Sequence, residues 1–337
     1  MKNAKSIPFY IVMCMLLLAP VQIYAATLVP VTFYTSWFAL AEDGGFYEAV
    51  ADGIYKKYGL NVTIKQGGPE VNGQQLLVAG RCQFYMGSPI DAIEAAAHGM
   101  PVVIVATSFQ VDPISVITHR NINSLYDLKK DDTELLVSMN EMETYLPWLE
   151  RKYGVRKEQV GPYTGDVAPF LADKNIAQQG FITDEPYDIF LAEKRWPRVF
   201  LLAHYGYPDY AYTIETTRRM ISNRPKIVSA FVKATLLGWA AYFKNPAPAN
   251  RLIQKANPKE TSARIKYAIE TMRKYNLVSG EKGSTARTEG IGVMTSTRWH
   301  KIFIMMVKDG DPVPPNFDYK KVYDLSFVKR DHIFIGK

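Results

Sequence analysis

Short apolar runs alternate with amphipathic segments from residue 28 to about residue 119, and this alternation limits the possible folds more than any other feature. Apolar runs of period 2 predict strands, whereas an apolar period of 3.6 residues predicts helices. We expect strands at Val31–Tyr34, Asn61–Lys65, Gln83–Met86 and Val102–Ala106, and helices at 45–57, 72–79 and 90–98. Turns rich in glycine and proline separate these segments. The pattern predicts an α/β fold with a mostly parallel sheet that helices cover on both faces.

A second α/β unit follows, and the chain then becomes helical. The expected strands are Ser115–Thr118, Leu135–Ser138, Gln178–Ile182, Val199–Ala203 and Tyr210–Glu215, and the expected helices are Glu141–Tyr153, Asp184–Lys194, Lys226–Phe243, Pro248–Ala256, Lys259–Asn276 and Thr295–Lys308. Strand crossings near 115–119 and 211–216 would join two lobes. We therefore expect residues 27–115 together with 216–337 to form lobe 1, and residues 116–215 to form lobe 2.

The first 26 residues have the organisation of a secretory signal peptide. Lys2 and Lys5 precede an apolar run from Ile7 to Ala19, and small residues follow at Ala25 and Ala26. We expect cleavage after Ala25 or Ala26 and a periplasmic mature protein. The apolar run is shorter than the ~20 residues that a transmembrane helix needs.

Composition excludes several classes of function. Cys82 alone remains after cleavage, so neither an intrachain disulfide nor a cysteine-based metal site is expected. The formal net charge of +7 falls to +5 without the signal peptide, and the basic residues are scattered in pairs. Such a distribution indicates a solvated surface, so we do not expect nucleic acid as a partner.

No catalytic or metal-binding motif stands out. The five histidines show no metal-ligand spacing, and no Gly-x-Ser-x-Gly sequence occurs. We expect no metal, no cofactor and no enzymatic activity. A structural or adhesive protein would need no pocket and could carry internal repeats, which the sequence lacks.

An aromatic pair ends the first expected strand and suggests a binding site. Trp37 and Phe38 follow the strand, and Gly44-Gly45 open the next helix. Ligands of open α/β sheets bind at the carboxyl ends of strands, where helix N-termini offer free N–H groups. Ser88, before Pro89, is expected to cap a further helix at the same edge. The alternative is that both aromatic side chains are ordinary core residues.

Acidic residues near this edge each have a structural alternative. Glu141 and Glu143 open an expected helix, where a carboxylate complements the helix dipole. Asp166 has the position of a helix N-cap, and Glu185 precedes Pro186 at a helix start. Each of these carboxylates is therefore either a ligand contact or a capping group.

Several segments together resemble a known family. They are Trp37-Phe38, Gly44-Gly45-Phe46-Tyr47-Glu48-Ala49, the run from Gly53 to Val62, Gly67-Gly68-Pro69, Gly80-Arg81-Cys82-Gln83-Phe84, Gly99-Met100-Pro101-Val102-Val103, Phe109-Gln110-Val111-Asp112-Pro113 and Thr183-Asp184-Glu185-Pro186-Tyr187. The chain resembles solute-binding proteins of ABC importers in the nitrate/sulfonate/taurine group. It is most similar to the branch that includes binders of thiamine pyrimidine precursors and of riboflavin.

The resemblance implies a fold, partners and roles for two residues. It implies a type II periplasmic-binding fold, a monomer, and an ABC permease and ATPase at the inner membrane as partners. In the pyrimidine-binding relatives a tryptophan stacks on the ring and a carboxylate takes ring or amine protons, which are the positions of Trp37 and Glu185. The pyrimidine-synthase branch has a cysteine-rich segment that this chain lacks, which argues against an enzyme.

The ligand expected from these residues is a small aromatic nitrogen heterocycle, of the thiamine-precursor or flavin type. Flat aromatic side chains suit a planar ring, and carboxylates accept protons from ring N–H or amino groups. An aliphatic sulfonate or another small anion is the alternative, although the candidate positions carry no cation. The candidate ligand-binding residues are Trp37, Phe38, Gly45, Tyr47, Ser88, Phe109, Glu143, Asp166, Glu185 and Tyr187.

Overall fold

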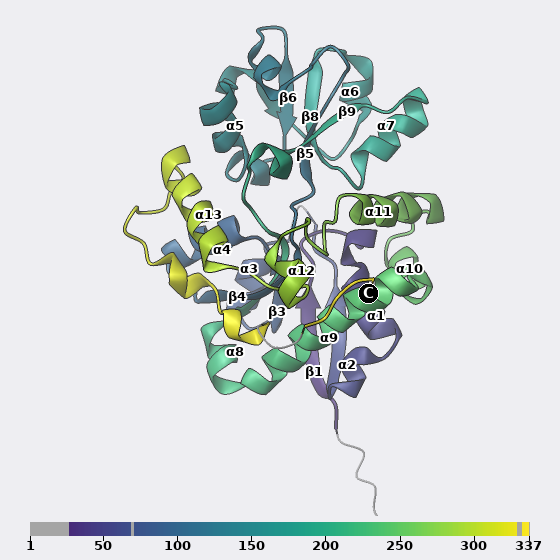
Figure 1. Cartoon of the computed structure of the whole chain (residues 1–337), viewed down its shortest axis with the longest axis vertical. Coiled ribbons are helices and arrows are strands. Elements are labelled where there is room, and N and C mark those ends of the chain that lie inside the picture. The colour runs from purple at the N-terminus through teal and green to yellow at the C-terminus, as the bar shows by residue number, and fades with distance from the viewer. Residues whose placement is uncertain (1–26, 69–70, 329–331, 337) are drawn as a thin grey trace, which may run out of the picture.

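Two five-stranded sheets, one in each lobe, follow one another along the long axis of the molecule (Figure 1). The computed structural model describes residues 27–68, 71–328 and 332–336. The predicted signal peptide, residues 1–26, therefore lies outside the described residues, which begin at Thr27. No helix in these ranges is both long enough and apolar enough to span a bilayer.

The first sheet has the strand order β2-β1-β3-β10-β4. Its strands are β1 (Val29–Tyr34), β2 (Leu60–Lys65), β3 (Phe84–Gly87), β4 (Val102–Phe109) and β10 (Ala211–Thr217). β1 runs parallel to β2 and β3, whereas β10 runs antiparallel to both of its neighbours. The sheet is therefore mixed, because β10 returns from the second lobe in the opposite direction.

Helices cover both faces of the first sheet. They are α1 (Gly44–Ala51), α2 (Ile54–Lys57), α3 (Gly73–Val78), α4 (Pro89–Ala97), α8 (Arg218–Asn223), α9 (Pro225–Lys244) and α10 (Ala247–Ala256). On one face Phe33 of β1 stacks on Phe46 of α1, and Phe84 of β3 stacks on Phe231 of α9. α3 and α4 pack against the other face.

The second sheet has the order β7-β6-β8-β5-β9. Its strands are β5 (Ile114–Thr118), β6 (Glu134–Val137), β7 (Val160–Pro162), β8 (Ile176–Phe181) and β9 (Arg198–Leu201), and its helices are α5 (Leu146–Tyr153), α6 (Ala168–Ala172) and α7 (Glu185–Glu193). α6 and α7 cover one face through Phe170 and Ile189, and α5 covers the other face.

The C-terminal helices lie beside the boundary between the two sheets. They are α11 (Ser262–Lys274), α12 (Thr285–Glu289) and α13 (Ser296–Asp309). α11 lies next to α7 in Figure 1, and α13 contacts both α4 and α5. The chain passes between the sheets twice, through residues 110–113 and 206–210. We call these segments the first and second crossings.

The α/β class and the two-sheet architecture predicted from the sequence are confirmed. The expectation of mixed, mostly parallel sheets is confirmed, since each sheet has one strand that runs against the others, β10 in the first sheet and β5 in the second. The helix expected at 45–57 breaks at Gly53, whose φ of 64° is left-handed. The helix expected from Glu141 begins at Leu146, because residues 140–142 form a single 3-10 turn. The residue limits of the two lobes stay a prediction.

Glycine permits the close approach of α1 to α9. A Cβ atom on Gly45 would lie 2.3 Å from Cδ2 of Trp239, and one on Gly238 would lie 2.1 Å from the carbonyl oxygen of Gly45. Contacts below 3.0 Å do not occur for real Cβ atoms, so a side chain at either position would force the helices apart.

We predict that Gly45→Ala lowers the free energy of unfolding by about 1–3 kcal/mol, the usual cost of overpacking a core. Urea denaturation followed by circular dichroism measures this change. Ala51→Ser, at the exposed end of the same helix, is the matched control and should change stability by less than about 0.5 kcal/mol. Equal stability of Gly45→Ala and the native chain would show that the packing of α1 on α9 is not tight.

Candidate functional site

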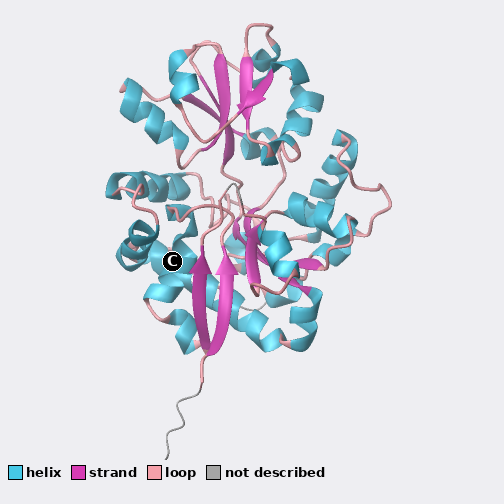
Figure 2. Cartoon of the chain, turned by 180° about the vertical axis from the view of Figure 1, so that it is seen from behind, coloured by secondary structure: helices cyan, strands magenta, loops and turns pink. Residues whose placement is uncertain are grey.

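The carboxyl ends of six strands meet at the boundary between the lobes. β4 ends at Phe109, immediately before the first crossing, and pairs there with Ala211 of β10. β3 is antiparallel to β10 and parallel to β1, so β1 and β3 also end at this boundary. In the second lobe Ile114 pairs with Phe181, so β8 ends there too. β6 runs parallel to β8, and β7 runs parallel to β6, so these two strands also end at the boundary. Figure 2 shows the first lobe's long parallel strands pointing toward the second lobe.

Trp37 and Phe38 follow the end of β1 and are exposed. Their side chains are 41% and 47% accessible, and their rings pack edge to face with centroids 5.4 Å apart. This exposure agrees with a binding role and argues against the alternative that both side chains are core residues. We call this pair the aromatic step.

Hydrogen bonds fix the loop that carries the aromatic step. The carbonyl oxygen of Trp37 accepts the Thr35 hydroxyl at 2.6 Å and the Gly67 N–H at 3.1 Å. Oε1 of Gln66 accepts the Ala39 N–H at 2.7 Å. A Cβ atom on Gly67 would lie 2.4 Å from the Thr35 carbonyl oxygen, so the two loops approach this closely because residue 67 is glycine. The exposed rings are therefore presented from an ordered backbone.

Four carboxyl groups gather where the crossings leave the sheets, and we call them the hinge acids. They come from the first turn of α4, the first crossing, the turn after β6 and the second crossing, and are Asp91, Asp112, Glu141 and Asp209. The sequence predicts Glu141 as either a ligand contact or a partner of the helix dipole, but it assigns no role to Asp91, Asp112 or Asp209. The available signal was their position, since each follows a strand end or lies in a crossing.

Local hydrogen bonds orient the hinge acids. Asp112 accepts the Ile114 N–H at 2.8 Å, and Asp209 accepts the N–H of the residue that follows it at 2.9 Å. Glu141 accepts the hydroxyl of Thr144 at 2.5 Å. Asp112, Asp209 and Glu141 therefore each use one oxygen to hold their own turn.

Burial and mutual repulsion keep protons on the hinge acids. Burial, and then the charges of Asp112 and Asp91, raise the pKa of Glu141 to about 8. Burial also raises the pKa of Asp112 to about 7. Burial, Asp112 and Asp91 raise the pKa of Asp209 well above its usual range, although Arg298 opposes the shift. Glu141 therefore keeps its proton up to about pH 8, and Asp112 up to about pH 7.

Arg298 of α13 ties the two crossings together. Its Nε donates to the Pro208 carbonyl at 2.6 Å, its Nη1 to the Gln110 carbonyl at 2.6 Å, and its Nη2 to the Asp209 carbonyl. The guanidinium lies over the ring of Tyr210, 3.8 Å from the centroid. All three nitrogens thus bond to backbone carbonyls, so this cation is committed to structure.

A second arginine joins the lobes at α11. Arg264 forms ion pairs with Asp184 and Asp188 at the start of α7, and with Glu260 at 3.3 Å. Tyr267 of the same helix donates to the Ile182 carbonyl at 2.9 Å. The cation of Arg264 is therefore also engaged by carboxylates.

Two predicted residues of lobe 2 take part in these contacts. Glu185 accepts the Tyr163 hydroxyl at 2.9 Å and the Phe181 N–H at 2.7 Å. Burial, and then the charge of Asp184, raise its pKa to about 8. Tyr187 stacks on Tyr267 with centroids 5.0 Å apart. Glu185 thus holds the turn between β8 and α7, but it does not cap α7, whose N-cap residue is Asp184.

Three predicted residues lie in the core of lobe 1. Gly45 faces Trp239, Tyr47 is buried, and Phe109 is fully buried with its ring 4.6 Å from that of Tyr212. Core packing accounts for all three positions, so we leave them out of the site proposed below.

The remaining candidates lie at helix starts or on the surface. Ser88 accepts the Asp91 N–H at 3.2 Å, which confirms that it caps α4. Glu143 and Asp166 are exposed, and Asp166 accepts the Ala168 N–H at 2.8 Å before α6. Among the described residues, no three His, Cys, Asp or Glu side chains are placed to hold a metal ion.

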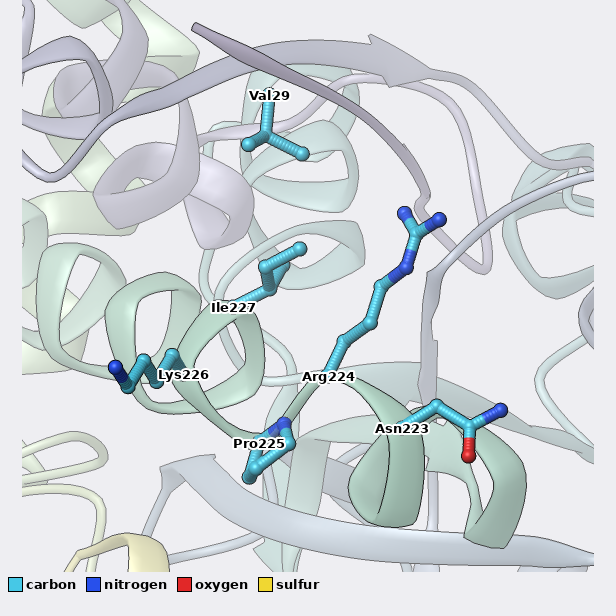
Figure 3. A pocket seen from close by; sticks show the side chains of 6 residues that line it. All are labelled: Val29, Asn223, Arg224, Pro225, Lys226 and Ile227. Carbon is cyan, nitrogen blue, oxygen red and sulfur yellow. The ribbon is translucent and has the colours of Figure 1, made fainter. Parts of the chain in front are cut away.

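A hollow of about 460 Å³ opens at the opposite end of lobe 1 (Figure 3). It lies where β1 and α9 begin, and its lining residues are Val29, Asn223, Arg224, Pro225, Lys226 and Ile227. Val29 is the first residue of β1, whereas the aromatic step follows the last. This hollow is therefore separate from the strand ends that face the other lobe.

Solved structures identify the class of fold. The aliphatic sulphonate binding protein SsuA of Escherichia coli is 13% identical, with a TM-score of 0.64 over 92% of this chain and 94% of that chain. The nitrate-binding protein NrtA of Synechocystis PCC 6803 is also 13% identical, with a TM-score of 0.59 over 89% and 87%. A Candida albicans protein described as having the generic periplasmic binding protein fold gives 0.60 at 13% identity, over 88% and 97%. This chain has the periplasmic binding protein fold.

The family follows from the sequence. The pattern of the NMT1/THI5-like family matches residues 41–249, which is more than half of the chain. The protein therefore belongs to the NMT1/THI5-like family. No curated protein matches its sequence significantly.

The raised carboxyl pKa values predict that stability falls as the pH rises. Burial raises the pKa of Glu42 and Glu141 to about 8, so the folded state binds more protons than the unfolded state above about pH 4. The contribution of these protonated groups to the free energy of unfolding is fully present below about pH 4. It falls as the pH rises and is lost as the pH passes through 7 to 8. Thermal denaturation between pH 5 and 8.5 should show a falling midpoint, and Glu141→Gln should make the fall shallower. A midpoint that rises over this range, or an unchanged slope in Glu141→Gln, would contradict this assignment.

Proposed function

We propose that the protein is the periplasmic solute-binding component of an ABC importer and that it captures a small aromatic nitrogen heterocycle between its lobes. The fold supports this proposal, since the structural relatives named above include sulphonate- and nitrate-binding proteins. The resemblance to the thiamine-precursor and riboflavin binders gives the ligand class, with the pyrimidine precursor or a flavin preferred over a sulfonate.

The aromatic step is the observation that carries the ligand proposal. Trp37 and Phe38 are large, exposed and held on an ordered loop at the carboxyl end of β1. Stacking on such a ring contributes ~0.5–1.5 kcal/mol beyond the area that it buries. A preordered loop also lowers the entropy cost of binding.

The charges near the lobe boundary favour a nitrogen heterocycle over an anion. A sulfonate or nitrate needs free cationic or N–H donors. Arg298 and Arg264 are instead bonded to backbone carbonyls and to carboxylates, respectively. The carboxyl oxygens of the hinge acids can accept hydrogen bonds from ring N–H or amino groups. A small anion remains the second candidate because two structural relatives are named for such ligands.

We also propose where the protein works and which partners it has. An exported, monomeric protein would deliver its ligand to a permease and an ATPase at the inner membrane, and it would perform no catalysis. Closure of the lobes would give the ligand contacts from both, and the ligand's higher affinity for the closed state would drive that motion.

Calorimetry with 4-amino-5-hydroxymethyl-2-methylpyrimidine, riboflavin and taurine tests the proposal. We expect one of the heterocycles to bind and taurine not to bind. Trp37→Ala should weaken binding by about 2 kcal/mol, or about thirtyfold in Kd, because the stacked ring and its buried area are lost. The fold should stay intact because the side chain is exposed.

Tyr126→Ala supplies the matched control. Tyr126 is also an exposed aromatic that packs edge to face, on Tyr153, but it follows the far end of β5. Its loss should leave the Kd unchanged. Tight taurine binding that survives Trp37→Ala would refute the heterocycle proposal.

A further inference from the structure

Helices α7 and α11 pack into different lobes. On α7, Ile189 is buried with Phe170 of α6 in the core of lobe 2. On α11, Ile265 and Met272 are buried in the core that also contains Phe46 of α1. The two helices nevertheless lie next to each other, and ion pairs join them (Figure 1). Contacts between them therefore cross the lobe boundary and exist only while the lobes are together.

Charged side chains form one part of this junction. Arg264 of α11 forms ion pairs with Asp184, the N-cap residue of α7, and with Asp188 in the first turn of that helix. Glu260, from the turn before α11, is a third carboxylate partner at 3.3 Å. Only 20% of the Arg264 side chain is exposed, so salt screens these pairs less than pairs on an open surface. The ion pairs therefore favour the arrangement in which α7 lies against α11.

Four aromatic rings pack at the same junction. Tyr267 of α11 stacks on Tyr187 with centroids 5.0 Å apart, and on Trp196 with centroids 5.4 Å apart. Trp196 also stacks on Phe190 of α7 at 4.3 Å. The Tyr267 hydroxyl donates to the Ile182 carbonyl at 2.9 Å. Tyr267 thus takes these ring contacts and this hydrogen bond from lobe 2, although its helix packs on lobe 1.

A separate bridge joins the lobes on the opposite side of the boundary. α13 contacts α4 of lobe 1 and α5 of lobe 2, and Asp309 at its end pairs with Arg151 of α5. In Figure 1, α13 and α11 lie on opposite sides of the crossings. A rotation about the crossings can thus separate α7 from α11 while the α13 bridge stays in place.

The contacts between α7 and α11 are made by the chain's own side chains. They stabilise the closed arrangement, in which these helices touch, before any ligand is bound. Closure therefore does not depend on the ligand's binding energy alone. A binding-competent state that is already populated also reduces the loss of apparent affinity that an open resting state would impose.

We propose that the side chains between α7 and α11 form a latch that holds the lobes of the ligand-free protein together, and that release of this latch opens the boundary on the α7 side. The latch residues are Asp184, Tyr187, Asp188, Trp196, Arg264 and Tyr267. The inference goes beyond the proposed function, because it concerns the protein without its ligand.

Small-angle scattering of ligand-free protein tests the latch. The protein is unfolded, dialysed and refolded beforehand, which removes any bound small molecule. Arg264→Gln and Tyr267→Ala should each increase the radius of gyration, with an unchanged circular dichroism spectrum. Tyr267→Phe keeps the stacked ring and loses the hydrogen bond to Ile182, so its increase should be smaller than that of Tyr267→Ala.

Lys174→Gln is the matched control. It removes an ion pair of α7 with Glu193 that lies within lobe 2, so the radius should stay at the native value. An unchanged radius in folded Arg264→Gln and Tyr267→Ala proteins would overturn the inference. An equal increase in the control would also overturn it, because loss of a pair within one lobe would then have the same effect.

A double variant separates a contact across the boundary from a local role of Arg264 in α11. Asp188→Asn should increase the radius in the native background and cause no further increase in the Arg264→Gln background, because the pair is already broken there. A further increase of the same size would show that the two residues act independently, and would overturn the latch. Asp188→Asn is isosteric and lies on the rim of the junction, so it decides the matter even where Arg264→Gln does not fold. No ligand enters these measurements, so their failure would leave the proposed function untouched.

Discussion

Three hydrogen bonds from Arg298 to backbone carbonyls hold the two crossings side by side, and the arrangement of both lobes depends on them. The crossings connect sheets whose strand ends would otherwise be free to take many relative positions. The same bonds place two carboxyl groups next to each other and remove the guanidinium from use by a ligand. The interaction that positions the lobes thus also places two buried carboxyl groups between them.

The two ends of the proposed site differ in their physical chemistry. The aromatic step is exposed and depends on a loop in which Gly67 lets two backbones approach closely. Asp112 and Asp209 of the hinge acids are buried, and burial is the main cause of their raised pKa values. A ligand with a flat ring and N–H or amino groups would match both ends at once. A small anion would match neither.

The sequence predicted the long, periodic elements well, because periodicity reports local burial. It located β1, α4 and α9 to within a few residues, and Ser88 was recognised as a cap from its position before Pro89. β7 and α6 are three and five residues long, too short for a periodic signal, and were missed. The antiparallel direction of β10 depends on the return crossing, which no local pattern encodes. The hinge acids were largely missed for the same reason, since their proximity depends on the pairing of Phe109 with Ala211.

The central proposal is that the region between the lobes binds a small aromatic nitrogen heterocycle. Mass spectrometry of small molecules released when the purified native protein is denatured tests this claim most directly. We predict about one equivalent of an aromatic nitrogen compound, and less of it from Trp37→Ala protein. Stoichiometric release of a sulfonate or another small anion would contradict the account.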